Sequence, residues 1–332
     1  MGRWLASTRR RFDFTHHYVA LPAEHAPSVG CTRRALPPAF DPVELEKERK
    51  VVIEETAPRG LSHGRIYDVF MATCFAGTAM RIPSWHAREP VGPGSRAAAG
   101  LLAAALRARQ LQSFVETSSR RPCFPKWSVV LIEPQPVEVS NGCPFPAVPD
   151  EPVRVETRSD ISQAYMLAGY VVPRPAGTRD LYALDVLSTL LGEGRSSRLH
   201  RRLTEELGLC PDVRTSYFDM KHLGLFYTDL SFEDPATRAS EEPSAQLERV
   251  RQAPPSEKEI EKAKKMLVSG FAFSNERASL IADLAHRIHS RLEDALAYIE
   301  CIRSVAAEEV VSAARKYLVG ENYREVRMRP GA

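Results

Sequence analysis

The sequence lacks any long hydrophobic run. No stretch of about 18 apolar residues occurs in its 332 residues, so we expect no transmembrane helix. The first residues include arginines, but no apolar segment follows them, and a signal peptide needs one. We therefore expect no membrane partner, and without a targeting signal the cytoplasm is the default expectation for its location.

Cysteine is scattered, and neither sign of charge dominates. None of the six cysteines forms a C-x-x-C pair, and their spacing through a long chain is not that of a disulfide framework. The 45 basic and 42 acidic residues leave a net charge of +3, whereas nucleic-acid-binding proteins concentrate excess positive charge on one face. The composition is that of an ordinary soluble protein, with no nucleic acid expected as partner.

The second part of the chain alternates between strand-like and helix-like segments. Runs rich in strand-forming residues alternate with segments whose apolar residues recur every three or four positions. The expected strands are 164–172, 213–218 and 223–232, with a short last strand, and the expected helices include 178–191, a long region after Ser256, 295–302 and 308–318. This order predicts an α+β domain, with helices gathered on one face of a largely antiparallel sheet.

The first 150 residues are less regular. Residues 41–55 predict a helix, with Asp41 as N-cap and Pro42 at its first position, and residues 66–75 predict another. Residues 120–149 hold seven prolines and are typical of a linker. We therefore expect a partial N-terminal half-domain at 1–120, a linker at 121–150 and a C-terminal half-domain at 151–332.

Two glutamates of the helix predicted at 41–55 form the strongest chemical signal. Glu48 and Glu55 are seven residues apart, which places them only about 20° apart around a helix. Leu45, Val51 and Val52 flank them, so both carboxylates lie within the apolar arc. An ionised carboxylate in such an arc needs a partner, either a metal ion or a cationic side chain. The spacing leaves both interpretations open.

Several blocks of the sequence are familiar in their order and spacing. They are FTHHYVALP at 14–22, EKERKVVIEE at 46–55, LLGEGRSSRL at 190–199, ELGL at 206–209, EIEKAK at 259–264 and VAAEEV at 305–310. Together they resemble the insulinase and mitochondrial processing peptidase family of zinc metallopeptidases, well over 150–330 and partly over 12–75. The resemblance implies two half-domains, each a mostly antiparallel sheet with helices packed on one face.

The resemblance also implies a zinc site that this chain does not complete. In the family, two histidines of an H-x-x-E-H motif and a downstream glutamate hold the zinc, and the motif's glutamate activates a zinc-bound water. By position, Glu55 matches the third zinc ligand and Glu48 the acidic residue that assists it. No H-x-x-E-H occurs in the chain. We therefore expect the first half-domain to be incomplete, and zinc, the cofactor of the family, not to be held tightly.

A second departure concerns the residues that orient the substrate. Active members of the family carry an arginine and a tyrosine seven residues apart in the second half-domain. The matching positions here are Thr204 and Pro211. Threonine lacks the cation and proline lacks the phenol, so neither can take over that role.

Two further stretches, 26–38 and 77–126, are rich in Arg, Pro and Gly where the family has regular elements. Native sequence, a decayed gene and a shifted reading frame are all compatible with them. Three interpretations follow. The chain is a non-catalytic homologue that pairs with a catalytic homologous subunit or with itself as a dimer. Alternatively, it belongs to a working zinc endopeptidase, with peptides as substrates, whose N-terminal segment is missing here, or it is a non-functional fragment. The missing motif favours the first interpretation.

Overall fold

The computed structural model describes residues 5–10, 15–20, 41–56, 62–76, 151–173, 178–220, 223–233, 237–274 and 292–331. The chain divides into two compact units. The first contains Met1–Arg59, Ser84–Cys143 and Arg277–Ala282, and the second contains Gly60–Pro83, Pro144–Glu276 and Asp283–Ala332. The domain boundaries expected from the sequence stay a prediction.

In the first unit, the described elements are a strand pair and a helix. Strand β1 (Leu5–Arg10) pairs antiparallel with β2 (Thr15–Ala20), and helix α2 spans Pro42–Thr56. The Asp41 carboxylate accepts hydrogen bonds from the backbone N–H groups of Val43 and Glu44, at 2.9 and 3.1 Å. This N-cap satisfies donors that the first turn leaves free, which explains why the helix begins where its sequence predicts.

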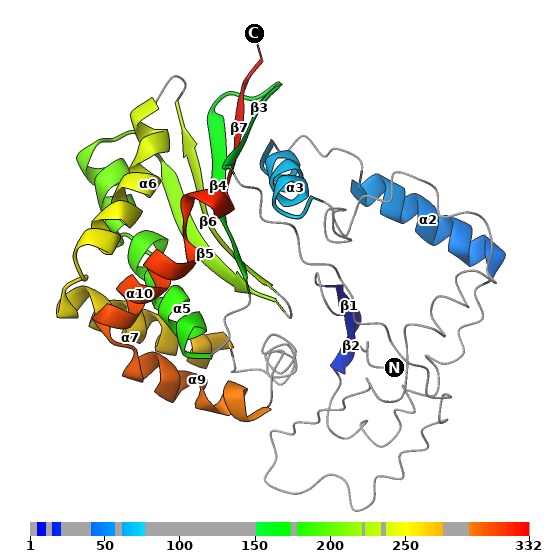
Figure 1. The fold of residues 1–332 in the computed structure, drawn as a ribbon. Coiled ribbons are helices and arrows are strands. Elements are labelled where there is room, and N and C mark those ends of the chain that lie inside the picture. The colour runs from blue at the N-terminus through cyan, green and yellow to red at the C-terminus, as the bar shows by residue number, and fades with distance from the viewer. Residues whose placement is uncertain are drawn as a thin grey trace, which may run out of the picture. The chain divides into compact units, whose positions relative to one another are not determined.

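The second unit is built on a five-stranded sheet with the order β3-β7-β4-β6-β5 (Figure 1). Its neighbours are antiparallel except for β3 and β7, which run parallel. The strands are β3 (Val153–Ser159), β4 (Ala164–Pro173), β5 (Asp212–Asp219), β6 (Leu223–Phe232) and β7 (Tyr323–Pro330).

Helices from residues 178–317 pack against one face of this sheet and share one apolar core with it (Figure 1). Met166 and Phe226 of the sheet meet Leu187, Ile260 and Val310 of the helices there. The helices are α5 (Thr178–Gly192), α6 (Thr237–Gln252), α7 (Glu257–Ser274), α9 (Leu292–Ser304) and α10 (Ala307–Tyr317), with a π-helical segment η4 (His200–Glu206) and a 3-10 turn η5 (Gly320–Asn322). The predicted α+β fold is confirmed.

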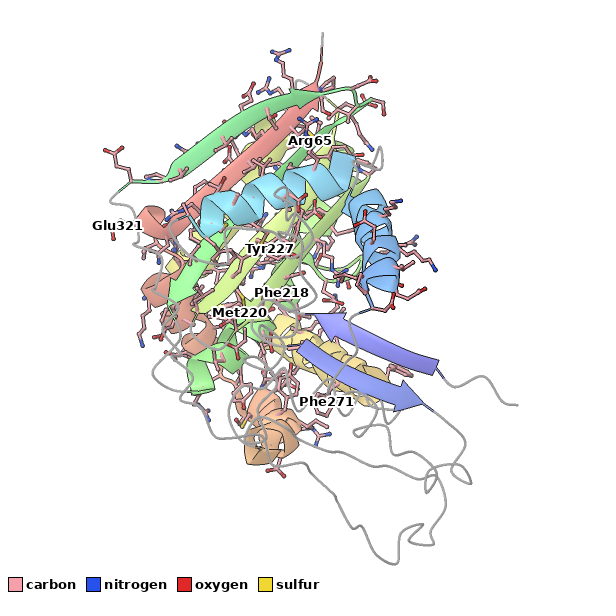
Figure 2. All side chains as sticks on the ribbon, turned by 90° about the vertical axis from the view of Figure 1, so that its right-hand side faces the viewer. Arg65, Phe218, Met220, Tyr227, Phe271 and Glu321 are labelled. Carbon is pink, nitrogen blue, oxygen red and sulfur yellow. The ribbon has the colours of Figure 1, made fainter. Side chains whose placement is uncertain are left out.

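Helix α3 (Ser62–Cys74) packs on the opposite face of the sheet, against β4 and β7. Its buried side chains include Ile66, Phe70 and Met71, each at most 1% exposed. Phe70 also contacts the ring of Tyr227 on β6, with 5.8 Å between centroids (Figure 2). A helix from the first part of the sequence thus completes the core of the second unit, which the sequence did not indicate.

Among the described elements, β1, β3, α6 and the 3-10 turn η5 had no explicit expectation from sequence. The stretches at 26–38 and 77–126, and the linker expected at 121–150, lie outside the described residues. Among the helices that the structure describes, none is both long enough and apolar enough to cross a membrane.

Candidate functional site

The block LLGEGRSSRL forms the end of α5 and the turn that follows it. A Cβ at Gly192 would lie 2.2 Å from the backbone nitrogen of Thr215 on β5, so only glycine allows this approach. Gly194 has φ of +74°, a conformation that side chains rarely adopt. The two glycines therefore fix how the chain leaves α5 and passes close to the sheet.

An ion pair ties this turn to the start of α7. The Arg198 guanidinium donates to both oxygens of Glu259, at 2.7 and 3.1 Å. Glu259 also accepts hydrogen bonds from the backbone N–H and the hydroxyl of Ser256, as in a capping box. The hydrogen bond from Arg198, with help from Ser256, lowers the pKa of Glu259 to about 2. The carboxylate is thus a charged clamp between two segments about 60 residues apart in sequence.

The π-helical segment η4 follows the turn and is held on both sides. Leu203 is fully buried in the core. On the outer side, Arg202 donates to Glu206 at 2.8 Å, and its Nε lies 3.6 Å from the buried carboxylate of Glu242 on α6. Arg249 approaches the same Glu242 oxygen at 3.4 Å. These contacts fix η4 against α6.

The two positions expected to orient a substrate lie at η4 and just before β5. Thr204 belongs to η4; its side chain is half-buried, and its hydroxyl has no hydrogen-bond partner among the described residues. Pro211 is exposed and directly precedes β5. The backbone that carries both positions is well packed, because Cys210 between them is buried. The backbone at these two positions is thus well packed, but Thr204 offers no cationic side chain and Pro211 offers no phenol.

The two glutamates predicted for metal chemistry both lie on α2. Glu48 is exposed, and Val51 beside it is 46% exposed, so this part of the predicted apolar arc is open to solvent. Glu55 lies in the last turn of α2, and its side chain lies outside the described residues. In the described part of the chain, no three His, Cys, Asp or Glu side chains are grouped closely enough to hold a metal ion. Their assignment as zinc ligand and helper stays a prediction.

Comparison with known proteins finds a family whose model matches part of the chain. The family described as "Peptidase M16 inactive domain" matches residues 110–267, which include the glycine turn, the Arg198–Glu259 clamp and η4. Over this stretch, a little under half of its length, the chain is similar to the M16 peptidases. The match is to the inactive domain of that family, which agrees with the resemblance predicted for the second half. No curated protein matches the sequence.

Solved structures share the M16 fold with the chain. A peptidase M16 inactive domain from Pseudomonas fluorescens aligns with a TM-score of 0.77 and 15% identity, covering 99% of this chain and 82% of that one. A protease from Helicobacter pylori aligns with a TM-score of 0.72 and 19% identity, covering 98% and 82%. A chain of complex III2 from Candida albicans aligns with a TM-score of 0.74 and 12% identity, covering 98% and 82%. At these identities the likeness supports the fold.

The clamp of this M16 relative was not found from sequence. Ser256 and Glu259 have the Ser-x-x-Glu spacing of a capping box, so the sequence contained a signal for that half of it. The partner Arg198 could not be found this way, since it lies 61 residues from Glu259. Sequence reasoning found the blocks LLGEGRSSRL and EIEKAK but missed the contact that joins them.

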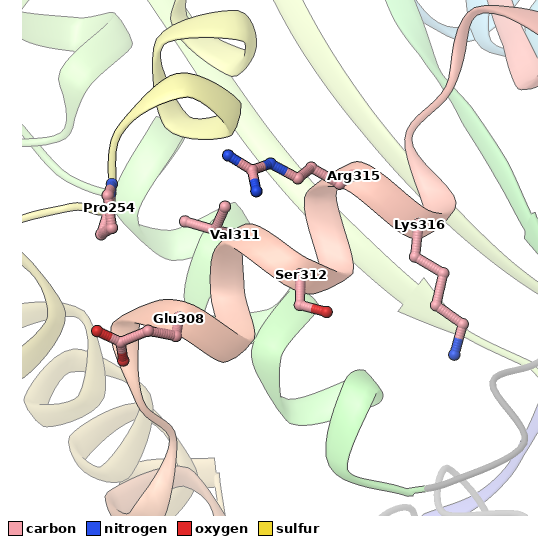
Figure 3. Close-up of a pocket in the computed structure, with 6 residues that line it drawn as sticks. All are labelled: Pro254, Glu308, Val311, Ser312, Arg315 and Lys316. Atoms are coloured by element: carbon pink, nitrogen blue, oxygen red, sulfur yellow. The ribbon is translucent and has the colours of Figure 1, made fainter.

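A shallow pocket lies along α10 of the M16-like unit (Figure 3). It has a volume of about 460 Å³, and its lining includes Pro254, Glu308 and Val311. Arg315, which also lines it, is engaged by the backbone carbonyl of Arg251, and Lys316 by Asp180 at 3.0 Å. Because both cations already have partners, we assign this pocket no role.

Proposed function

We propose that this chain is a non-catalytic M16 relative that acts by associating with another protein chain. The proposal rests on the packed second half-domain, in which Thr204 and Pro211 stand where the resemblance places the substrate-orienting arginine and tyrosine. The glycine turn, the Arg198–Glu259 clamp and η4 pack together. The fold is therefore retained at the place where the expected arginine and tyrosine are replaced. A retained fold without those groups suits binding better than peptide hydrolysis.

The donor set does not fit a zinc ion. Catalytic zinc sites use three protein ligands and structural sites four. This chain offers Glu55 as the matched ligand and Glu48 as its neighbour, and Glu48 is exposed on α2. The sequence contains no H-x-x-E-H to supply the two histidines. We therefore derive no hydrolytic step for this chain.

Association is supported by the kind of protein that shares the fold. One similar structure is a chain of complex III2 from Candida albicans, a multi-subunit assembly. By this analogy the partner is a homologous subunit that carries the intact H-x-x-E-H motif, or a second copy of the chain.

Three measurements on the purified chain test the proposal. Elemental analysis after dialysis should find far less than one zinc per chain, and a fluorogenic peptide mixture should stay uncleaved. Mixed with an M16 homologue that carries H-x-x-E-H, the chain should share its elution peak in size-exclusion chromatography. Stoichiometric zinc, together with a peptidase activity that Glu55→Gln abolishes, would overturn the proposal. Separate elution, with the chain itself monomeric, would remove its association half.

A further inference from the structure

A groove of about 610 Å³ lies against the outer side of α7. Its lining combines the turn after α5 with successive turns of the helix. The lining residues are Glu193, Lys258, Glu261, Lys262, Lys265, Met266 and Ser269. The clamp between Arg198 and Glu259 holds the two walls together, so the groove has a fixed framework.

The groove lining holds three lysines against two glutamates, Glu193 and Glu261, so its formal charge is positive. Lys258 and Lys265 are exposed, and neither has an ion pair within the described part of the chain. Lys262 donates to the hydroxyl of Ser196, which is uncharged. The acidic Glu261 is already engaged by Lys264, at 3.0 Å. A ligand that enters this groove therefore meets three ammonium groups at helical spacing.

The same side of α7 continues into an exposed aromatic ring. Phe273 is 70% exposed, the most open of the large apolar side chains described. It lies seven residues beyond Met266, and therefore only about 20° away around the helix. Phe271, two residues earlier, is by contrast half-buried and stacks on Tyr298 with 4.9 Å between centroids (Figure 2). The outer side of α7 thus has a cationic part followed by an apolar part.

We propose that this side of α7 binds an acidic segment of a partner protein, one that also carries a large apolar side chain. Carboxylates of the segment would pair with Lys258, Lys262 and Lys265, and its apolar residue would cover Met266 and Phe273. Such a mixture of charge and apolar contact is how amphipathic segments are recognised in grooves. The inference rests on the proposed function in one respect, that the chain acts by binding another protein.

The probe is a fluorescein-labelled amphipathic peptide of about 14 residues made of glutamate and leucine, titrated with the full chain in fluorescence anisotropy. Binding should weaken at least about tenfold in the variant Lys258→Glu/Lys262→Glu/Lys265→Glu, since three charge pairs become repulsive. Phe273→Ser should weaken binding about threefold or more, through lost apolar contact. Raising the salt concentration should weaken binding of the original chain and have little effect on the triple variant.

The matched control is Arg158→Glu/Arg238→Glu/Arg303→Glu, which changes the net charge equally at exposed positions away from the groove. It should retain the affinity of the original chain, and circular dichroism should show that both triple variants are folded. Equal weakening by the two variants, or unchanged affinity in the groove variant, would overturn the proposal. So would tighter binding to phosphatidylserine vesicles that the peptide cannot displace, or self-association that the groove variant abolishes.

Failure of this proposal and failure of the proposed function are distinguishable. Peptide binding at α7 without co-elution of an M16 homologue would leave the groove assigned and the homologous partner wrong. Suppose instead that the chain does not bind the peptide and that the groove variant still co-elutes with the homologue. The proposed association would then stand, and the assignment of α7 as a binding surface would be wrong.

Discussion

Helices α5, α6, α7, α9 and α10 cover one face of the five-stranded sheet, and all of them lie in the range 178–317. The opposite face is covered over β4 and β7 by α3, which comes from residues 62–74. On that face Leu167, Val326 and Met328 are each at most 1% exposed. One face is thus covered by helices that lie near the strands in sequence, and the other by a helix about 100 residues or more from the strands it contacts. The segment 151–332, expected from sequence to be the second half-domain, therefore leaves out a helix that packs on its sheet.

The largest expected effect tests whether α3 belongs to the core. Phe70→Asp places a carboxylate at a fully buried position, and it should lower the free energy of unfolding by about 5 kcal/mol, enough to unfold the unit. Urea denaturation followed by circular dichroism measures this. Arg65→Asp, at an exposed position of the same helix, is the control and should cost less than about 1 kcal/mol. Equal behaviour of the two variants would show that α3 is dispensable to the unit.

The helical face can be disturbed most strongly at the turn after α5. Gly192→Ala forces a methyl group to within 2.2 Å of the Thr215 backbone, and should cost about 3 kcal/mol as the turn moves away from the sheet. Gly270→Ala is the control, because a Cβ there has no described atom within 4 Å apart from its chain neighbours and the backbone of its own helix. That variant should gain up to about 1 kcal/mol, since alanine favours a helix more than glycine does. A harmless Gly192→Ala would mean that α5 and β5 are less closely packed than described.

A half-buried acid on α5, Asp185, should give the stability of the chain a measurable pH dependence. Loss of solvent raises the pKa of Asp185 to about 7, against an ordinary value of 3.8, although the Tyr298 hydroxyl donates to it at 3.0 Å. Between these pH values only the unfolded chain ionises, so the native chain loses stability as pH rises and stays lower above pH 7. Asp185→Asn should therefore raise the free energy of unfolding by about 2 kcal/mol at pH 8 and change little below pH 4.

Asp180 on the same helix is the contrasting control. Burial would raise its pKa, but hydrogen bonds from Tyr317 and Lys316 outweigh that effect and lower the pKa overall. Asp180→Asn should destabilise the chain at neutral pH, opposite in sign to Asp185→Asn. If both substitutions shift the free energy of unfolding in the same direction across the pH range, the raised pKa of Asp185 is wrong.

The two faces also differ in how far sequence could predict them. Elements with strong local signals were predicted closely: β4, α5 and α10 have periodic apolar residues, and Asp41 caps α2. Strand β3 was missed because it is an edge strand with exposed Arg154, Glu156 and Arg158. Helix α6 was missed because it contains Pro243, a residue that usually ends or kinks a helix.

Long-range contacts were beyond such reasoning. The docking of α3 on the sheet joins residues about 100 to 250 positions apart, and nothing in the amphipathic pattern of α3 specifies which sheet it covers. The same holds for the candidate site. The positions of Thr204 and Pro211 followed from resemblance, whereas the pairing of Arg198 with Glu259 needed the fold.

The smallest expected effect concerns that pairing, on the helical face. Glu259→Gln removes the charge that Arg198 and Ser256 stabilise, and should lower the free energy of unfolding by about 1 kcal/mol at pH 7, because the carboxylate is partly open to solvent. Hydrogen bonding to Arg198 lowers the pKa of Glu259 to about 2 from 4.5, so its contribution is present above pH 4.5 and is lost as pH falls toward 2. Thermal melts of both chains at pH 7, 4 and 2.5 should therefore converge at the acid end. Glu257 is exposed and lies two residues before Glu259. The variant Glu257→Gln should therefore have the melting temperature of the original chain at every pH. A constant gap for Glu259→Gln across this range would assign its effect to lost packing instead of charge.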